Sequence, residues 1–152
     1  MFDRVLLTTD GSEFAEAAAS YAESIGAAHI TVVEVIDSIG HILSRTTGSE
    51  MSVTLAEQFV DAERELARNH LDHVVEQLKA AGVADVGSAV LEGHAGQEIV
   101  ELAHSGNFDV VVMSTHGRSG LRRVILGSVA DYVAHHIRGK AVLLVHPQAD
   151  EG

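Results

Sequence analysis

Short apolar runs alternate with segments of helical periodicity along the whole chain, and this alternation restricts the fold more than any other feature. Strand-like apolar runs are expected at residues 2–9, 28–37, 83–91, 110–113 and 140–146. Apolar residues recur at helical spacing at residues 14–25, 52–81, 95–104 and 128–137. Alternating strands and helices predict an α/β fold with a parallel, doubly wound five-stranded sheet and helices on both faces.

Residues that commonly begin or end helices lie at the boundaries of these segments. Ser12 precedes the first helical segment and is a plausible N-cap, and Gly26 follows that segment as a natural stop. Residues 38–51 contain two glycines and several Ser and Thr, and are expected to form a loop. No internal repeat or linker is evident in the 152 residues, so we expect one domain over 1–147 and an acidic tail over 148–152.

Composition excludes several classes of protein. The formal net charge of −12 argues against a nucleic acid partner, because phosphate-backbone binding needs a basic surface. The absence of cysteine excludes disulfides and thiolate chemistry. No apolar run approaches the roughly 20 residues of a membrane span, and the first residues lack the pattern of a signal peptide. We therefore expect a cytoplasmic protein that does not associate with membranes.

Glycines follow the fourth strand-like run in a pattern suited to an anion. Gly117 and Gly120 come shortly after Met113, and Gly127-Ser128 opens the next helical segment. Glycine lets the backbone approach a ligand closely, and the N–H groups at a helix N-terminus attract phosphate. Ser128 can cap that helix or offer its hydroxyl to a phosphate oxygen. The simpler alternative is that the glycines only punctuate a loop. The chain contains neither the Walker pattern nor the G-x-G-x-x-G dinucleotide pattern.

The same region resembles the nucleotide-binding signature of the universal stress protein family, G-x2-G-x9-G-[ST]. Gly117, nine intervening residues and Gly127-Ser128 match its second half, whereas the first glycine of the signature is replaced by Ser114. The resemblance covers nearly the whole chain and includes VLLTTDGS at 5–12, TVVEVID at 31–37 and AVLLV at 141–145. It implies the strand order 3-2-1-4-5 and a ligand crevice between the first and fourth strands.

The resemblance also implies an ATP-binding branch of the family, with ATP, ADP or AMP bound. Asp10 would contact the nucleotide or a phosphate-bound Mg²⁺, and the main chain of Val35 would read the adenine edge. Thr8 stands where the family often has proline, and its hydroxyl could reach the ligand or merely end the strand. The remaining positions that the resemblance places at the nucleotide are Met113, Ser114, His116, Gly117, Arg118, Gly120, Gly127, Ser128 and Val129.

Each of these positions also has a simpler structural interpretation. Asp10 could act only as a turn residue, and Val35 could be only a core side chain. Ser114 could weaken binding relative to glycine, or its hydroxyl could bond phosphate or ribose. Arg118 could neutralise a phosphate tail or be solvated in an exposed loop. His116 is better suited to a structural role than to catalysis.

The chain shows no convincing nucleophile–base pair and no second carboxylate placed to act as a base. We therefore expect a regulatory nucleotide-binding protein with at most slow ATP hydrolysis. A non-nucleotide interaction module of the same family and a true hydrolase remain alternatives. The family further implies a homodimer through the fifth strand, whose residues 141–145 form an apolar edge, and the identity of any regulatory partner protein stays open.

Overall fold

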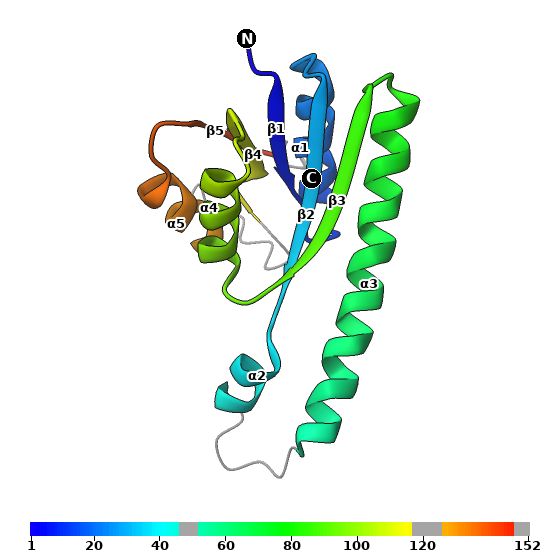
Figure 1. The fold of residues 1–152 in the computed structure, drawn as a ribbon, viewed down its shortest axis with the longest axis vertical. Helices are drawn as coiled ribbons and strands as arrows, with labels where there is room; N and C mark the ends of the chain where they lie inside the picture. Colours follow the sequence, from blue (N-terminus) through cyan, green and yellow to red (C-terminus); the bar gives the residue numbers. More distant parts are fainter. Residues whose placement is uncertain (46–51, 117–125, 148–152) are drawn as a thin grey trace, which may run out of the picture.

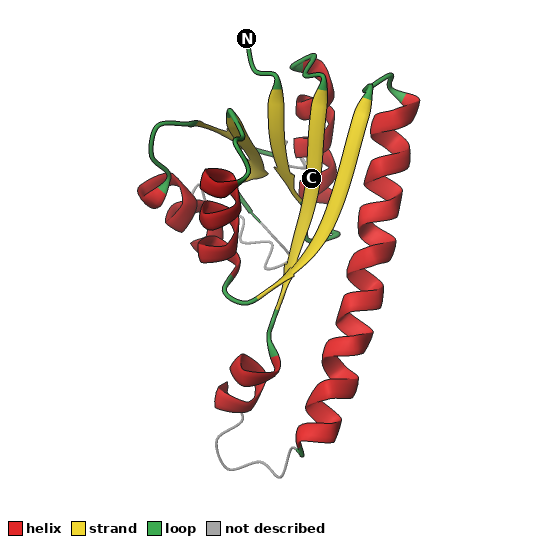
Figure 2. Ribbon diagram, viewed as in Figure 1, coloured by secondary structure: helices red, strands yellow, loops and turns green. Residues whose placement is uncertain are grey.

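The computed structural model describes residues 1–45, 52–116 and 126–147. Five parallel strands form one sheet in the order β3-β2-β1-β4-β5, as the resemblance implies (Figures 1 and 2). The strands are β1 (Arg4–Thr8), β2 (His29–Ile36), β3 (Asp85–Glu92), β4 (Val110–Ser114) and β5 (Ala141–Val145). The helices are α1 (Glu13–Ser24), α2 (Ile39–Arg45), α3 (Val53–Ala80), α4 (Ala95–Ser105) and α5 (Ser128–His136).

Helices cover both faces of the sheet, and the strands alternate their apolar side chains between the two faces. Val5 and Leu7 of β1 point toward α1 and α3 in one buried cluster, whereas Leu6 lies in a second cluster with α4 and α5. All three side chains are at most 1% exposed. Burying a side chain of this size contributes about 1.5–3 kcal/mol, so the two clusters fix the helices against the sheet.

Serine side chains cap the N-termini of α1 and α3. The Ser12 side chain accepts a hydrogen bond from the Ala15 N–H at 3.3 Å and caps α1. Ser52 caps α3 in the same way, accepting from Leu55 N–H at 3.1 Å. Ser128 is different, because Gly127 is the N-cap of α5 and makes no side-chain cap bond. The expectation that Ser128 could cap this helix is therefore wrong, since Ser128 is already the first helical residue.

The expectation of a loop over 38–51 is also wrong, because Ile39–Arg45 forms helix α2. Ile42 is 8% exposed and packs in a third buried cluster with Ala56 and Val60 of α3. The glycine and serine residues of this segment suggest a loop, and its apolar stripe is too short to indicate a helix. Tertiary packing is nevertheless sufficient to stabilise this short helix. In Figure 1, α2 and the first half of α3 extend together beyond the sheet. Residues 46–51 lie outside the described part of the chain.

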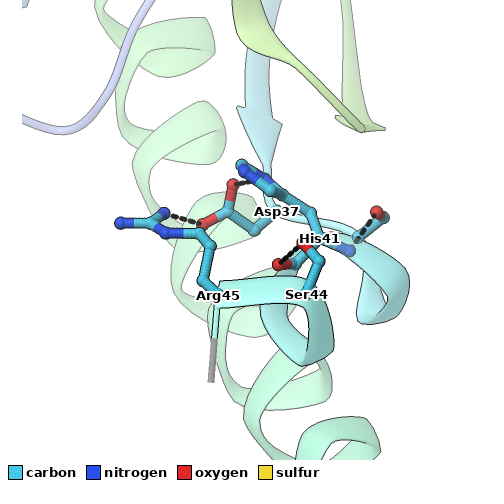
Figure 3. Close-up of polar contacts among 5 residues, drawn as sticks. Asp37, His41, Ser44 and Arg45 are labelled. Atoms are coloured by element: carbon cyan, nitrogen blue, oxygen red, sulfur yellow. Dashed lines mark hydrogen bonds and ion pairs between the residues drawn. The ribbon is translucent and has the colours of Figure 1, made fainter. Parts of the chain in front are cut away.

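Polar contacts hold α2 to the end of β2. Asp37 lies between His41 and Arg45, 2.7 Å from the His41 Nδ1 and 3.6 Å from the Arg45 Nη1 (Figure 3). The Ser44 hydroxyl donates to the His41 carbonyl at 2.8 Å. The His41 ring also packs against the His94 ring, with the centroids 4.6 Å apart. These contacts place α2 beside the point where the chain enters α4.

Asp109 joins the start of β4 to the start of β1. Its Oδ2 accepts hydrogen bonds from the Arg4 N–H at 2.8 Å and the Asp3 N–H at 2.9 Å. The hydrogen bonds from Arg4 and Asp3 hold the pKa of Asp109 below its usual value, because they favour the ionised carboxylate. The stabilisation is therefore present above the unfolded pKa and is lost as the pH falls through the lower folded pKa.

We expect Asp109→Asn to reduce stability at neutral pH and to weaken the acid dependence of unfolding. Urea denaturation from pH 7 down to pH 2 measures both effects. The two proteins should differ most above about pH 4, the unfolded pKa of aspartate, and converge below it. Parallel stability curves over the whole range would show that the Asp109 charge makes no contribution.

None of the helices in the described ranges is long and apolar enough to cross a membrane.

Candidate functional site

A cavity of about 370 Å³ lies at the carboxyl ends of β1, β2 and β4. Strand order reverses at β1 and β4, which is where doubly wound sheets form ligand crevices. Nine of the residues singled out in the sequence line this cavity: Thr8, Asp10, Val35, Met113, Ser114, His116, Gly127, Ser128 and Val129. Gly117, Arg118 and Gly120 lie outside the described residues.

The turn after β1 is built from local hydrogen bonds and a left-handed glycine. Asp10 Oδ1 accepts from the Ser12 N–H at 3.0 Å, and Thr9 Oγ1 accepts from the Gly11 N–H at 3.2 Å. Gly11 has φ +78°, a conformation that favours glycine. Asp10 is thus a turn residue, as its simpler interpretation proposes, and it also lines the cavity. The two interpretations are compatible because one carboxylate carries two oxygen atoms.

Thr115 organises the opposite wall and was missed by the sequence reasoning. Its side chain is fully buried, and its backbone N–H donates to the Val145 carbonyl of β5 at 3.0 Å. The Thr115 carbonyl accepts from the Gly127 N–H at 2.7 Å, and the Thr115 Oγ1 lies 2.9 Å from the His116 Nδ1. One residue therefore joins β4, β5 and the start of α5. A threonine after an apolar strand carries no distinctive sequence signal.

Gly127, the N-cap of α5, packs closely against the backbone of Thr115. A Cβ atom at Gly127 would lie 3.0 Å from the Thr115 carbonyl oxygen, a tighter contact than real Cβ atoms usually make. Ser128 and Val129 follow as the first residues of α5, where backbone N–H groups have no partner within the helix. The dipole of the helix favours an anion at this end.

Ser114 ends β4 at the same cavity. Its Oγ accepts from the His116 N–H at 3.3 Å, so the serine that replaces glycine in the signature stabilises the first turn of the following loop. The His116 ring lines the cavity and packs near Phe14, with the ring centroids 6.5 Å apart.

The cavity is more acidic than the sequence reasoning predicted. Besides Asp10, the residues Glu34, Asp37 and Glu63 line it, and the sequence did not point to any of these three. None of the described lining residues is lysine or arginine. Glu34 was detectable in principle, because a glutamate between Val33 and Val35 interrupts a strand that is otherwise apolar. Glu63 was not detectable, because its helix faces solvent over most of its surface.

Glu34 is 3% exposed and pairs with His70 of α3. The His70 Nδ1 lies 2.9 Å from Oε2 and 3.2 Å from Oε1 of Glu34. His70 also packs against the turn after β1, because a Cβ atom at Gly11 would overlap the imidazole ring. The His70 side chain is 22% exposed.

Among the residues that the structure describes, no group of three or more His, Asp or Glu side chains is arranged to hold a metal ion. A cation at Asp10 would therefore depend on oxygen atoms from a ligand, as Mg²⁺ commonly does at phosphate sites.

Comparison with known proteins places the chain in one family. The family model for the universal stress protein family matches residues 1–146. A putative universal stress protein of Staphylococcus aureus is 32% identical over 89% of this chain and 79% of its own length. Universal stress protein MJ0577 of Methanocaldococcus jannaschii is 28% identical over 95% of each chain.

Solved structures share the same fold. The structure of MJ0577 superposes with a TM-score of 0.81 at 24% identity, over 99% of both chains. A universal stress protein in complex with cAMP has a TM-score of 0.69 at 25% identity, over 97% of this chain and 99% of that one. The family model and these relatives match the chain, and its five-stranded sheet has the order 3-2-1-4-5. The chain therefore belongs to the universal stress protein family.

Proposed function

We propose that this protein binds an adenine nucleotide in the cavity between β1, β2 and β4 and acts as a nucleotide-responsive regulatory protein of the cytoplasmic stress response. The observation that carries the proposal is the cavity itself, which brings Asp10, Ser114 and the start of α5 together at the switch point of the sheet. A related universal stress protein that holds cAMP supports the adenine assignment.

The cavity offers separate surroundings for the parts of a nucleotide. The start of α5, with Gly127 as its N-cap, suits the phosphate groups because free N–H groups and the helix dipole attract anions. The apolar side chains of Val35, Ile99 and Met113 suit the base. The main chain of Val35 is proposed to read the adenine edge, and Thr8 lies at the end of β1 nearby. Gly117, Arg118 and Gly120 are proposed phosphate contacts outside the described residues.

Mg²⁺ fits the chemistry of this site when phosphates are present. Asp10 would supply one oxygen ligand, and the remaining ligands would be phosphate oxygens and water. The acidic lining gives a cation a further role, because it would offset repulsion between the carboxylates and a polyphosphate. ATP would depend on Mg²⁺ more strongly than AMP for this reason.

Mass spectrometry of the purified protein after denaturation tests the proposal without choosing a ligand in advance. We expect AMP, ADP or ATP to be released in an amount that approaches that of the protein. A protein that never copurifies with nucleotide and cannot be loaded with it would not fit the proposal.

A slow ATP hydrolase is the second candidate, and it is favoured by the acidic residues Glu34, Asp37 and Glu63 beside Asp10, because the cavity contains more acid–base groups than binding alone requires. We expect purified protein with ATP and Mg²⁺ to turn over far below the roughly 1–100 per second of typical kinases. Phosphate release measured over hours decides this. Turnover approaching the kinase range would make the protein an enzyme.

We also propose a homodimer in which the β5 edges of two copies meet. Residues Val142, Leu143 and Leu144 of this edge strand are only partly buried. Val142→Asp should convert dimers to monomers, because a buried charge at a strand edge opposes pairing. Light scattering measures the mass, and circular dichroism checks the fold, because Val142 also packs against the α4–α5 face. A wild-type protein that is monomeric at high concentration would refute the dimer.

A further inference from the structure

Helix α3 carries two apolar faces. One face is buried against the sheet and α2, and its residues are Ala56, Val60, Ala67, Leu71, Val74 and Leu78. The second face is formed by Leu55, Phe59, Ala62 and Leu66. Spacings of four, three and four residues place these side chains in one row along the helix. We call this row the exposed stripe.

The exposed stripe presents large apolar side chains to solvent. Leu55, Phe59 and Leu66 are 50%, 49% and 46% exposed, and Ala62 is exposed as well. A single exposed apolar side chain is ordinary, but a row of large ones on one helix face is typical of an interaction surface. The stripe is therefore a candidate surface for a partner.

Further along α3, the same side of the helix is covered by α1. His73 and Gln77 continue the row, seven and eleven residues after Leu66. The His73 Nε2 lies 3.9 Å from the Glu16 Oε1, and the Gln77 Nε2 donates to the Glu23 Oε1 at 3.0 Å. The first half of α3 extends beyond the sheet (Figure 1). Helix α1 therefore covers the later part of this side of α3, and the exposed stripe continues the same helix-packing face beyond α1.

Acidic residues lie along both edges of the exposed stripe. Glu63 is four residues after Phe59 and three before Leu66. Glu65 is three residues after Ala62. Positions three or four apart are neighbours on a helix surface, so both carboxylates border the stripe. Glu65 is exposed and Glu63 is partly exposed, which leaves both able to meet a partner.

The basic residues of α3 lie away from the exposed stripe. Neither Arg64 nor Arg68 is three or four residues from any member of the stripe, and both line a second cavity with Ser88 of β3. Arg64 is paired with Glu92 of β3. Lys79 lies in the last turn of the helix. An apolar row with acidic edges is complementary to a helix that has an apolar row and basic edges.

The same charges argue against two other occupants of the stripe. Two copies of the chain that met through their stripes around a two-fold axis would bring acidic edges together, and like charges oppose such a contact. The surface of an anionic membrane would be repelled in the same way. A cationic protein segment meets neither obstacle.

We propose that the exposed stripe docks an amphipathic helix of a partner protein, with apolar side chains against Phe59 and Leu66 and with lysine or arginine beside Glu63 and Glu65. The docked helix would pack along α3 as α1 does further on. The inference is independent of nucleotide binding, and it gives the chemistry of the regulatory partner that the sequence leaves open.

Fluorescence anisotropy with two labelled model peptides tests the inference on the full chain. The probe is a peptide of about 18 residues made of leucine and lysine, with the leucines at three- and four-residue spacing so that they form one helix face. The comparison peptide has the same composition and charge, but its leucines are scattered over all sides of the helix. We expect the wild-type protein to bind the probe at least about tenfold more tightly than the comparison peptide.

Variants of the stripe show where the probe binds. Phe59→Ser and Leu66→Ser should each weaken probe binding about tenfold, because truncating a central apolar anchor removes most of its contacts. Tyr21→Ser is the matched control, since Tyr21 is 55% exposed on α1 and lies outside the stripe. It should leave the affinity unchanged. Circular dichroism checks that all three variants fold, which the exposure of the replaced side chains favours.

Charge variants test the acidic edges separately. Glu65→Lys should weaken probe binding about three- to tenfold at low salt, and the loss should diminish at high salt because of screening. Glu57→Lys makes the same change in net charge at an exposed position of α3 that is not three or four residues from any member of the stripe. Its effect should be less than about twofold. Equal losses in the two variants would contradict the assignment of a basic partner.

Three further outcomes would overturn the inference. Equal binding of the two peptides would show that charge alone attracts them. Unchanged probe affinity in both Phe59→Ser and Leu66→Ser would place the peptide elsewhere on the protein. A lower mass of Phe59→Ser than of the wild type in light scattering would show that a second copy of the chain covers the stripe instead.

Discussion

Gly127→Val is expected to abolish measurable nucleotide binding while leaving the helical circular dichroism signal nearly intact. Even a Cβ atom at this position would lie 3.0 Å from the Thr115 carbonyl oxygen, and the valine methyl groups extend further. Either the Thr115 carbonyl or the start of α5 must move, and both form the wall proposed to hold phosphate. Losing even one charge-assisted hydrogen bond there would weaken binding by about 10- to 100-fold.

Gly127→Ala provides the graded control for this prediction. Gly127 has φ −59°, so a side chain causes no backbone strain and any effect must come from the space that it occupies. Alanine adds only the Cβ atom and should weaken binding less than valine does. Titration of AMP into both variants measures the series. Unchanged binding in Gly127→Val would mean that phosphate does not approach α5.

Gly11→Ala is expected to cause the largest loss of stability among single changes at the site. The φ of +78° penalises any residue with a side chain by about 1–2 kcal/mol. The added Cβ would also overlap the His70 ring, which Glu34 holds in place. We expect a total loss of about 2–4 kcal/mol in the free energy of unfolding, together with weaker nucleotide binding.

Two further variants separate the causes of that loss. Gly26 has φ +73°, and no heavy atom of the described residues lies within 4 Å of the position that a Cβ would take there. Gly26→Ala should therefore show the backbone penalty alone. In a His70→Ala background, Gly11→Ala should cost about as much as Gly26→Ala does, roughly 1–2 kcal/mol. Urea denaturation measures all of these values. Equal losses for Gly11→Ala and Gly26→Ala in the wild-type background would show that His70 does not constrain the turn.

The regular elements were predictable because their signals are local. Ser12 caps α1 as its position before an apolar-periodic segment suggests. The strand order came from the family resemblance and is confirmed, since periodicity carries no information on which strands are neighbours. Helix α2 was missed because only packing of Ile42 against α3 distinguishes it from a Gly- and Ser-containing loop.

Of the residues that line the cavity, only those that belong to the family motif could be predicted from the sequence. Asp10, Ser114 and Gly127 were found because they follow strands or precede a helix, and the fold brings those ends together. Glu34 and Glu63 line the cavity through tertiary packing, and His70 contacts Glu34, since β2 and α3 are adjacent only in the folded chain. The contacts that orient Thr115 join three elements and likewise have no signature in the sequence.

Titration calorimetry of the wild-type protein with ATP, ADP and AMP in the presence of Mg²⁺ tests the central claim most directly. We expect saturable binding of at least one of them, with one site per chain and a Kd below about 1 mM, corresponding to more than roughly 4 kcal/mol of binding free energy. The same titration with Gly127→Val should give no binding heat. An absence of saturable heat with all three nucleotides at millimolar concentration would contradict the account.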